Sequence, residues 1–404
     1  MFPFLHLPLP AFDCFYKFLN VSEIILLSQC SKRVKTIVED HEGPKNNRIL
    51  SVDIEKYQAN ISIQTIQKNK NIPEKEFSWN INVKEDVYEF DREEVSSTSE
   101  DGSFTNEDES FEEELNEYKE LKIENIIWNV SMECENYWQS PSPVEPPSLE
   151  ARLLVLVEFF QNLFKIPVHK IYFDFESCLE FDKFFKKSPV ICKAKSIWID
   201  SIDRLIDKEQ MNFMLANFVT ENLSMNVSTW NYSYQGAFNY SKVRFAQATW
   251  MTPGAFLTLA STCKHMSLLG ATQISDEVLN QFIKNWMTGD NRTLEYIKVS
   301  REVDFDPTLH SDDSDNPLDD PVLENPLDKT IILEGIEHTP GTKKGEHAAR
   351  YTRGHFEDPY KYENGVDIRR SDGLMANVLV GEEGNYFLFT VWYEEPNLVE
   401  AVVN

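Results

Sequence analysis

Short apolar strands alternate with helical segments across residues 149–300, and this alternation restricts the possible fold more than any other feature. Helical periodicity over 149–164 leads to a β-type segment at 169–175. Further β-type segments begin near 195, 223, 242, 265 and 294, so that successive strand starts are 26, 28, 19, 23 and 29 residues apart. Thr252-Pro253 and Ser275 are typical helix starts inside this pattern.

One strand and one helix per roughly 20–29 residues is the spacing of leucine-rich repeats. The units diverge too far for a consensus to be visible, so we predict a leucine-rich-repeat-like (LRR-like) domain over 149–300. A single doubly wound α/β domain is the structural alternative. A β-meander is expected after it, because Asp372-Gly373 and the segment 381–385 are turn signals between β-type runs.

The first forty residues form a different, helical region. Pro8 suits a first helical turn, and Phe12, Phe15 and Leu19 fall on one helix face. Ser22 and Ser31 are candidate N-caps for two further short helices. Three such helices carry more apolar surface than a module of this size can bury, so we expect a partner. The alternatives are a signal peptide, opposed by the missing basic n-region, and a helical cap on the rest of the chain.

The remaining segments of the chain differ in composition, and this predicts where one region ends and the next begins. Residues 85–120 hold sixteen acidic residues and two basic ones, Arg92 and Lys119. This segment therefore carries half of the chain's net charge of −28. The run 140–148 is a proline-rich spacer where we place a boundary. The predicted fold class is α+β or α/β repeat. The predicted order is a three-helix module (1–45), a short β linker with two strands around a turn (46–84), an acidic disordered loop (85–120), a strand and spacer (121–148), the LRR-like domain (149–300), a second acidic disordered loop (301–329) and the β-rich end (330–395).

The acidic balance, with 39 basic and 67 acidic residues, argues against nucleic-acid and anionic-membrane binding. Six scattered cysteines form no CxxC pair, so we expect no metal site and reduced thiols in the cytoplasm or nucleus. Glycosylation sequons at Asn222, Asn226, Asn231 and Asn239 leave a secreted or lumenal glycoprotein as an open alternative.

The sequence carries no recognisable catalytic motif. It has no G-x-S-x-G, P-loop, G-x-G-x-x-G after a strand or H-E-x-x-H. His347 and His355 stand near Arg350, Tyr351 and Arg353, which reads as a polar loop more readily than as a metal site. We expect no enzyme activity and no cofactor, and we interpret Trp250, Phe282 and Trp286 as core residues.

Two stretches resemble known families. The Leu7-Pro8 opening, the run from Ser22 to Ser31 and Lys32-Arg33 resemble an F-box, although a second proline, Pro10, departs from the pattern. In that family the motif docks the Skp adaptor of a cullin-based (SCF) ubiquitin ligase. The second stretch, 243–299, resembles the type-2 F-box-associated region of a large nematode F-box family, taken there as the substrate-selecting half. Its matching points are Thr249-Trp250, Asn280-x-Phe282-x-x-x-Trp286 and Leu294-Glu295-Tyr296, with the string 367–373 downstream.

The resemblance implies a non-catalytic substrate receptor of an SCF-type ubiquitin ligase. Its partners would be a Skp-family adaptor, a cullin and an unknown protein substrate, with no nucleic acid and no membrane. A protein-binding scaffold that delivers nothing to a ligase is the other open function. By resemblance and apolarity, the residues expected to bind the adaptor are Leu7, Pro8, Phe12, Phe15, Ile24, Leu26 and Leu27.

Overall fold

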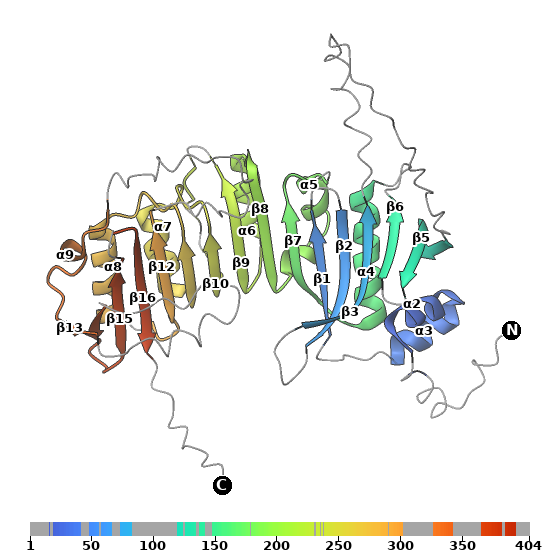
Figure 1. The fold of residues 1–404 in the computed structure, drawn as a ribbon, viewed down its shortest axis with the longest axis horizontal. Helices are drawn as coiled ribbons and strands as arrows, with labels where there is room; N and C mark the ends of the chain where they lie inside the picture. Colours follow the sequence, from blue (N-terminus) through green and yellow to red (C-terminus); the bar gives the residue numbers. More distant parts are fainter. Residues whose placement is uncertain are drawn as a thin grey trace, which may run out of the picture. The chain divides into compact units, whose positions relative to one another are not determined.

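The chain divides into two compact units, Met1–Ala194 and Lys195–Asn404, each of which mixes helices and strands (Figure 1). None of the helices described is long and apolar enough to cross a bilayer. The computed structural model describes residues 16, 19–41, 48–55, 58–66, 73–82, 119–123, 126–134, 137–141, 148–177, 179–229, 232–234, 236, 238–289, 291–301, 326–341, 365–381 and 384–392.

The first unit combines a mixed sheet with helices. Its elements are α2 (Val21–Gln29), α3 (Lys32–His41), β1 (Arg48–Ile54), β2 (Gln58–Ile66), β3 (Pro73–Asn82), β4 (Lys119–Ile123), β5 (Ile126–Cys134), β6 (Tyr137–Pro141), α4 (Leu149–Phe164), β7 (Val168–Asp174), α5 (Phe181–Phe185) and a 3-10 turn, η3 (Ile191–Lys193).

The strands of this unit pair in the order β7-β1-β2-β3-β6-β5-β4. β1 and β2 are antiparallel, with Val52 opposite Ile61, which confirms the two strands predicted around a turn. β3 continues the antiparallel run, whereas β7 lies parallel to β1 and β6 parallel to β3. The segment predicted as a linker therefore supplies central strands of a sheet.

Aromatic side chains of the sheet pack against α4. The Phe160 ring lies 5.9 Å from the Phe77 ring and 6.3 Å from the Trp79 ring, measured between centroids. Trp128 of β5 meets Trp79 edge-on at 5.4 Å. All four side chains are almost fully buried. Because these rings come from β3, β5 and α4, the core joins segments that were predicted to belong to separate regions of the chain.

The predicted boundary at 140–148 consequently does not separate the two units. β6 enters the first of those prolines, Pro141, while still paired to β3, and α4 begins at Leu149 within the same unit. The observed division falls at Ala194–Lys195, inside the predicted LRR-like range 149–300. A proline can end a strand without ending a domain. Here aromatic residues from before and after the proline-rich run pack in one core, so the run lies within a single unit.

The second unit is built on a sheet of parallel strands with a meander at one end. Its elements are β8 (Ser196–Leu205), α6 (Lys208–Asn217), β9 (Asn222–Ser228), β10 (Lys242–Phe245), α7 (Pro253–Thr262), β11 (His265–Leu268), α8 (Asp276–Thr288), β12 (Tyr296–Ser300), α9 (Lys329–Ile332), β13 (His338–Pro340), β14 (Val366–Arg369), β15 (Met375–Val380) and β16 (Tyr386–Trp392).

Strands β8 to β12 lie side by side in chain order, and every neighbouring pair is parallel. A doubly wound sheet would instead reverse its order at a switch point, so that alternative is wrong for these five strands. Thr252 and Ser275 cap α7 and α8 as predicted, each accepting a hydrogen bond from a backbone N–H three residues on. When each right-handed crossover adds the next strand at the same edge of the sheet, all of the crossover helices lie on one face of the sheet.

Alternating side chains give this sheet two unlike faces. The core face carries apolar residues that are buried, among them Ile197, Leu223, Val243, Met266 and Ile297, which stand in register across the five strands. The opposite face, called the polar face below, consists of Ser196, Trp198, Asp200, Asn222, Ser224, Asn226, Lys242, Arg244, His265, Ser267, Tyr296 and Lys298.

A loop takes the place of a helix between β9 and β10. The hydroxyls of Tyr234 and Tyr240 both donate to the carbonyl of Leu215 in α6, at 3.3 and 3.0 Å, and Tyr232 donates to the Asn212 side chain at 3.0 Å. Burial raises the pKa of the Tyr234 hydroxyl above its ordinary value. The neutral tyrosines thus fix this crossover against α6.

The end of the chain forms the predicted meander. β14, β15 and β16 are successive antiparallel neighbours, and β16 then pairs antiparallel with β12. Gly373 turns the first hairpin with a φ of 90°, in the region that favours glycine. Gly384 turns the second with a φ of 68°, and its carbonyl accepts the Leu327 N–H at 2.8 Å.

Part of the predicted acidic disordered loop 301–329 is ordered. Leu327 is buried, and Asp328 caps α9 by accepting from the Thr330 N–H at 2.7 Å. Its own N–H donates to Asp276 at 3.1 Å. The second Asn-Pro-Leu-Asp sequence (325–328) therefore ends in a helix start, which the acidic composition concealed. Most of the predicted loop 85–120 and residues 302–325 lie outside the described residues.

Replacing Phe282 by alanine should lower the free energy of unfolding by about 3–5 kcal/mol, because its ring packs against three others of the core. The centroid distances are 5.8 Å to Phe256, 6.4 Å to Phe387 and 4.9 Å to Phe389. Urea unfolding followed by fluorescence would measure it. Phe213→Ala is the matched control, since Phe213 is half-exposed; an equal loss in both variants would contradict the packing described.

Candidate functional site

The N-terminal helices form the first candidate surface. Asn20, and not the predicted Ser22, caps α2, accepting from the Glu23 N–H while Glu23 accepts from the Asn20 N–H, both at 2.8 Å. Asn is as good a cap as Ser and stands three residues before a glutamate, the spacing of a capping box. Ser31 does precede α3 as predicted, and its hydroxyl accepts from Val34 N–H at 3.2 Å.

These helices pack within the first unit. α3 contacts α4, α2 contacts β3, and the Lys35 ammonium lies 5.4 Å from the centroid of the Phe159 ring. Val34 and Val38 of α3 are buried, whereas Ile37 is half-buried. The two described helices are thus attached to the body of the unit, as the helical-cap alternative also expected.

The predicted adaptor-binding residues fall into three groups. Ile24 is 1% exposed and packs in the interior of the unit. Leu26 is 40% exposed, and Leu27 beside it is half-buried. Their roles in docking stay predictions. Four others lie outside the described residues: Leu7, Pro8, Phe12 and Phe15.

The second candidate region contains the matching points of the F-box-associated resemblance. Trp250 and Trp286 are both nearly buried, with centroid distances of 5.1 Å between the Trp250 and Phe245 rings and 5.1 Å between the Trp286 and Phe389 rings. The Asn280 amide donates to the carbonyls of Ile332 and Glu334, both at 2.9 Å, and so holds the turn after α9 on α8. These residues build the unit rather than a binding pocket, as the core interpretation predicted.

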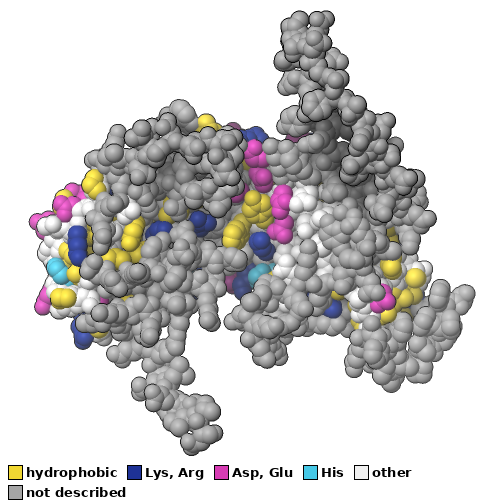
Figure 2. Space-filling model, viewed as in Figure 1, with side chains coloured by type: hydrophobic (Ala, Val, Ile, Leu, Met, Phe, Trp, Pro, Cys, Tyr) yellow, Lys and Arg dark blue, Asp and Glu magenta, His cyan; other side chains and the backbone are white. Residues whose placement is uncertain are grey.

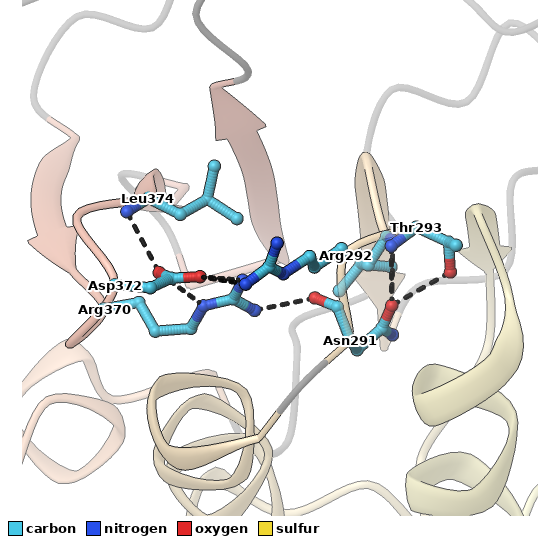
Figure 3. A network of polar contacts seen from close by, with 7 residues as sticks. Asn291, Arg292, Thr293, Arg370, Asp372 and Leu374 are labelled. Atoms are coloured by element: carbon cyan, nitrogen blue, oxygen red, sulfur yellow. Dashed lines mark hydrogen bonds and ion pairs between the residues drawn. The ribbon is translucent and has the colours of Figure 1, made fainter.

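An arginine network joins two stretches that are far apart in the sequence, the segment after α8 and the segment after β14 (Figure 3). Arg370, which is 3% exposed, donates from Nε and Nη2 to the two Asp372 carboxylate oxygens at 2.9 and 2.7 Å. Its Nη1 donates to the Asn291 carbonyl at 2.7 Å, and its guanidinium lies 5.2 Å from the Trp286 ring centroid. The Asn291 side chain in turn accepts from the Leu294 N–H at 3.1 Å.

Asp372 holds the hairpin side of this network. The hydrogen bonds from Arg370, followed by the one from Leu374 N–H, keep the pKa of the Asp372 carboxyl well below its usual range. Exposed Arg292 adds a weaker ion pair at 3.9 Å. The network therefore fixes the β14–β15 hairpin against the loop between α8 and β12, which is a structural task.

A titratable cluster lies at the start of β11 and β12. The Glu295 carboxylate binds the Lys264 ammonium at 2.7 Å and the His265 Nε2 at 2.7 Å. Burial lowers the pKa of His265, although Glu295 opposes it. Burial alone would raise the pKa of Glu295, but the hydrogen bonds from Lys264 and His265 outweigh it and leave that pKa lowered. A neutral His265 that donates from Nε2 fits both directions.

The remaining sequence candidates give no chemical site within the described residues. No group of three or more metal-binding side chains occurs in the ranges that the structure covers, and His347 and His355 lie outside them. Asn222 and Asn226 are half-buried in β9, where their amides donate to Ser196 and Asp200, each at 2.9 Å. The side chains of two of the four sequon asparagines therefore make hydrogen bonds to residues of the neighbouring strand on the polar face.

The polar face was not among the features predicted from the sequence. In the strand that begins near 242, Lys242 and Arg244 alternate with buried Val243 and Phe245. A period of two in a parallel strand is the signal that could have revealed a second, polar surface, because fully covered parallel strands read as continuous apolar runs.

Comparison with known proteins bears on the same unit. Residues 236–299 match the family of F-box-associated regions. The matched stretch runs from the loop before β10 through α7, β11 and α8 into β12. The matched stretch thus includes three of the parallel strands, Trp250 in the turn before α7, and α8 with Trp286. Comparison with curated proteins gave no match, and neither did comparison with solved structures.

Replacing Arg370 by lysine should lower the free energy of unfolding by about 2 kcal/mol, because an ammonium cannot replace the paired bonds to Asp372 together with the one to Asn291. Thermal unfolding measured by circular dichroism would test it. Arg369→Lys is the control, since Arg369 is the neighbouring residue at the end of β14 and is exposed. Equal melting temperatures for both variants would contradict the structural role of Arg370.

Lowering the pH from 7 to 5 should reduce stability through His265. Because its folded pKa is lowered, the unfolded chain takes up the proton first, and stability falls as the pH drops through the ordinary histidine pKa. Glu295 adds a loss only below the ordinary carboxyl pKa, since its folded pKa is also lowered. His265→Gln keeps a donor for Glu295 and should flatten the dependence of the melting temperature on pH; an unchanged slope would refute this assignment.

Proposed function

We propose that this protein is the substrate-receptor subunit of an SCF-type ubiquitin ligase. The N-terminal helices would dock a Skp-family adaptor that is bound to a cullin, and the second unit would hold a protein target. The observation that carries the proposal is the match of residues 236–299 to F-box-associated regions. The order of the chain, with F-box-like helices before that region, supports it.

The exposed side of α2 supports the docking half of the proposal. Leu26 is 40% exposed, and Leu27 and Cys30 continue the accessible surface beside it. Exposed leucines on a short amphipathic helix are suitable anchors for a partner's groove. Ile24 and Ile25, which are fully buried, would hold α2 in the unit rather than contact the adaptor.

The second unit supports the target-holding half. Consecutive parallel strands with helices between them are the arrangement of leucine-rich repeats, and we propose that this unit is LRR-like and related to the nematode family with type-2 associated regions. The chain itself would perform no chemistry. Ubiquitin transfer would follow from the high effective concentration of the target near the cullin-bound machinery, in the cytoplasm or nucleus.

The test is recovery of the adaptor and cullin with the tagged full chain from cells. Leu26→Glu combined with Leu27→Glu should reduce recovery at least tenfold, because losing a central anchor costs on the order of 2 kcal/mol or more. Adding Pro8→Ala to Leu27→Ala tests the predicted N-terminal contact in the same assay.

Leu205→Glu serves as the matched control, since Leu205 is 52% exposed but belongs to β8 in the other unit. Circular dichroism would confirm that each variant is folded. Undiminished recovery of the adaptor by the folded double variant would contradict docking through α2. Recovery of adaptor and cullin without ubiquitylation of a co-purifying protein would favour the scaffold alternative.

A further inference from the structure

The loop 186–193, which follows α5 in the first unit, differs in charge from the rest of the chain (Figure 1). Residues 183–195 hold five lysines and neither Asp nor Glu, although the chain's net charge is −28. On the face of the molecule drawn in Figure 2, by contrast, Lys and Arg side chains are scattered among apolar and acidic ones. The loop is therefore a candidate for an interaction that depends on positive charge.

Three of the five lysines are already paired with carboxylates, and two are not. The ion pairs are Lys183 with Glu180, Lys186 with Asp182 at 3.0 Å and Lys195 with Glu221 at 3.5 Å. Lys187 and Lys193 are both exposed, and neither ammonium group has an ion pair or a hydrogen bond to any residue that the structure describes. These two ammonium groups are available to a partner.

Exposed apolar groups lie between the two available lysines. Pro189 is exposed, and Val190 is 44% exposed. The Lys193 N–H donates to the Val190 carbonyl at 3.1 Å, and in a 3-10 turn of this kind residues three apart lie on the same side. The Lys193 side chain therefore stands beside Val190, so that an ammonium group and an apolar side chain face solvent together.

The backbone of the loop is held in place by buried residues. Ile191 and Cys192 of η3 are both buried. The Ile191 N–H donates to the Ser188 carbonyl at 3.1 Å, and the Cys192 thiol donates to the Phe185 carbonyl at 3.6 Å. A partner would not have to order this loop, which lowers the free-energy cost of binding.

We propose that the loop 186–193 binds a segment of another protein in which an apolar side chain is flanked by Asp or Glu. Pro189 and Val190 contact the apolar side chain, and Lys187 and Lys193 bind the carboxylates beside it. A nucleic acid suits the loop less well, because its phosphates would be repelled by the net charge of −28 and would leave Val190 without an apolar partner. The proposal does not depend on the ligase role.

The experiment is fluorescence anisotropy with the full chain and a short labelled peptide that has one central Leu flanked by Glu residues. One matched peptide has Gln in place of Glu, and the other has Ser in place of Leu. Each change should weaken binding about tenfold, because one removes the ion pairs and the other removes the apolar contact. Higher ionic strength should weaken binding of the Leu–Glu peptide, since salt screens exposed charges.

Variants of the loop assign the two contacts separately. Lys187→Glu combined with Lys193→Glu should abolish the preference for Glu over Gln. Val190→Ser should abolish the preference for Leu over Ser. Circular dichroism would confirm that the variants are folded, as expected for substitutions at exposed positions.

Each variant has a matched control in the second unit. Lys208→Glu combined with Lys284→Glu makes the same change of net charge at exposed positions of α6 and α8. Val219→Ser makes the same apolar-to-polar change at a valine that is 63% exposed. Both controls should keep both preferences.

Three results would overturn the proposal. Equal binding of the three peptides by the unaltered chain would exclude recognition of acidic and apolar groups. Equal losses in the loop variants and their controls would show a general effect of charge or apolarity. Binding of the Leu–Glu peptide only after removal of the acidic residues 85–118 would identify that segment of the chain itself as the occupant of the loop.

Discussion

The alternation of side chains along β8–β12 is the constraint on which the second unit depends. Val243 and Phe245 point to the core face and are buried, whereas Lys242 and Arg244 point the other way. A shift of one residue in any strand would exchange these faces. The same periodicity thus builds the core under α7 and α8 and leaves a polar surface on the opposite side.

The residues by which the unit resembles F-box-associated regions maintain this arrangement. Trp286 contacts Phe389 from the core side and Arg370 from the hairpin side, and Asn280 binds the turn after α9. Family-typical residues of this kind specify a scaffold.

The sequence predicted the secondary structure of this unit well, because short strands, caps at Thr252 and Ser275 and the Asp372-Gly373 turn are local signals. The prediction failed where the structure depends on contacts between residues that are far apart in the sequence. Trp128 and Phe160 unite segments on both sides of a proline-rich run, and Leu327 is held by Gly384 from another part of the chain. Composition could not reveal these contacts. For the candidate sites, apolarity alone did not separate buried Ile24 from exposed Leu26.

The central claim is that two different surfaces bind two different partners, and cross-linking mass spectrometry of the chain purified with its partners tests it most directly. Lys32 lies exposed on α3 near the proposed adaptor surface, and Lys208 and Lys284 lie exposed on α6 and α8 of the second unit. The account predicts links from Lys32 to the adaptor and from lysines of the second unit to a target protein. Adaptor links confined to the second unit, or target links confined to α3, would contradict it.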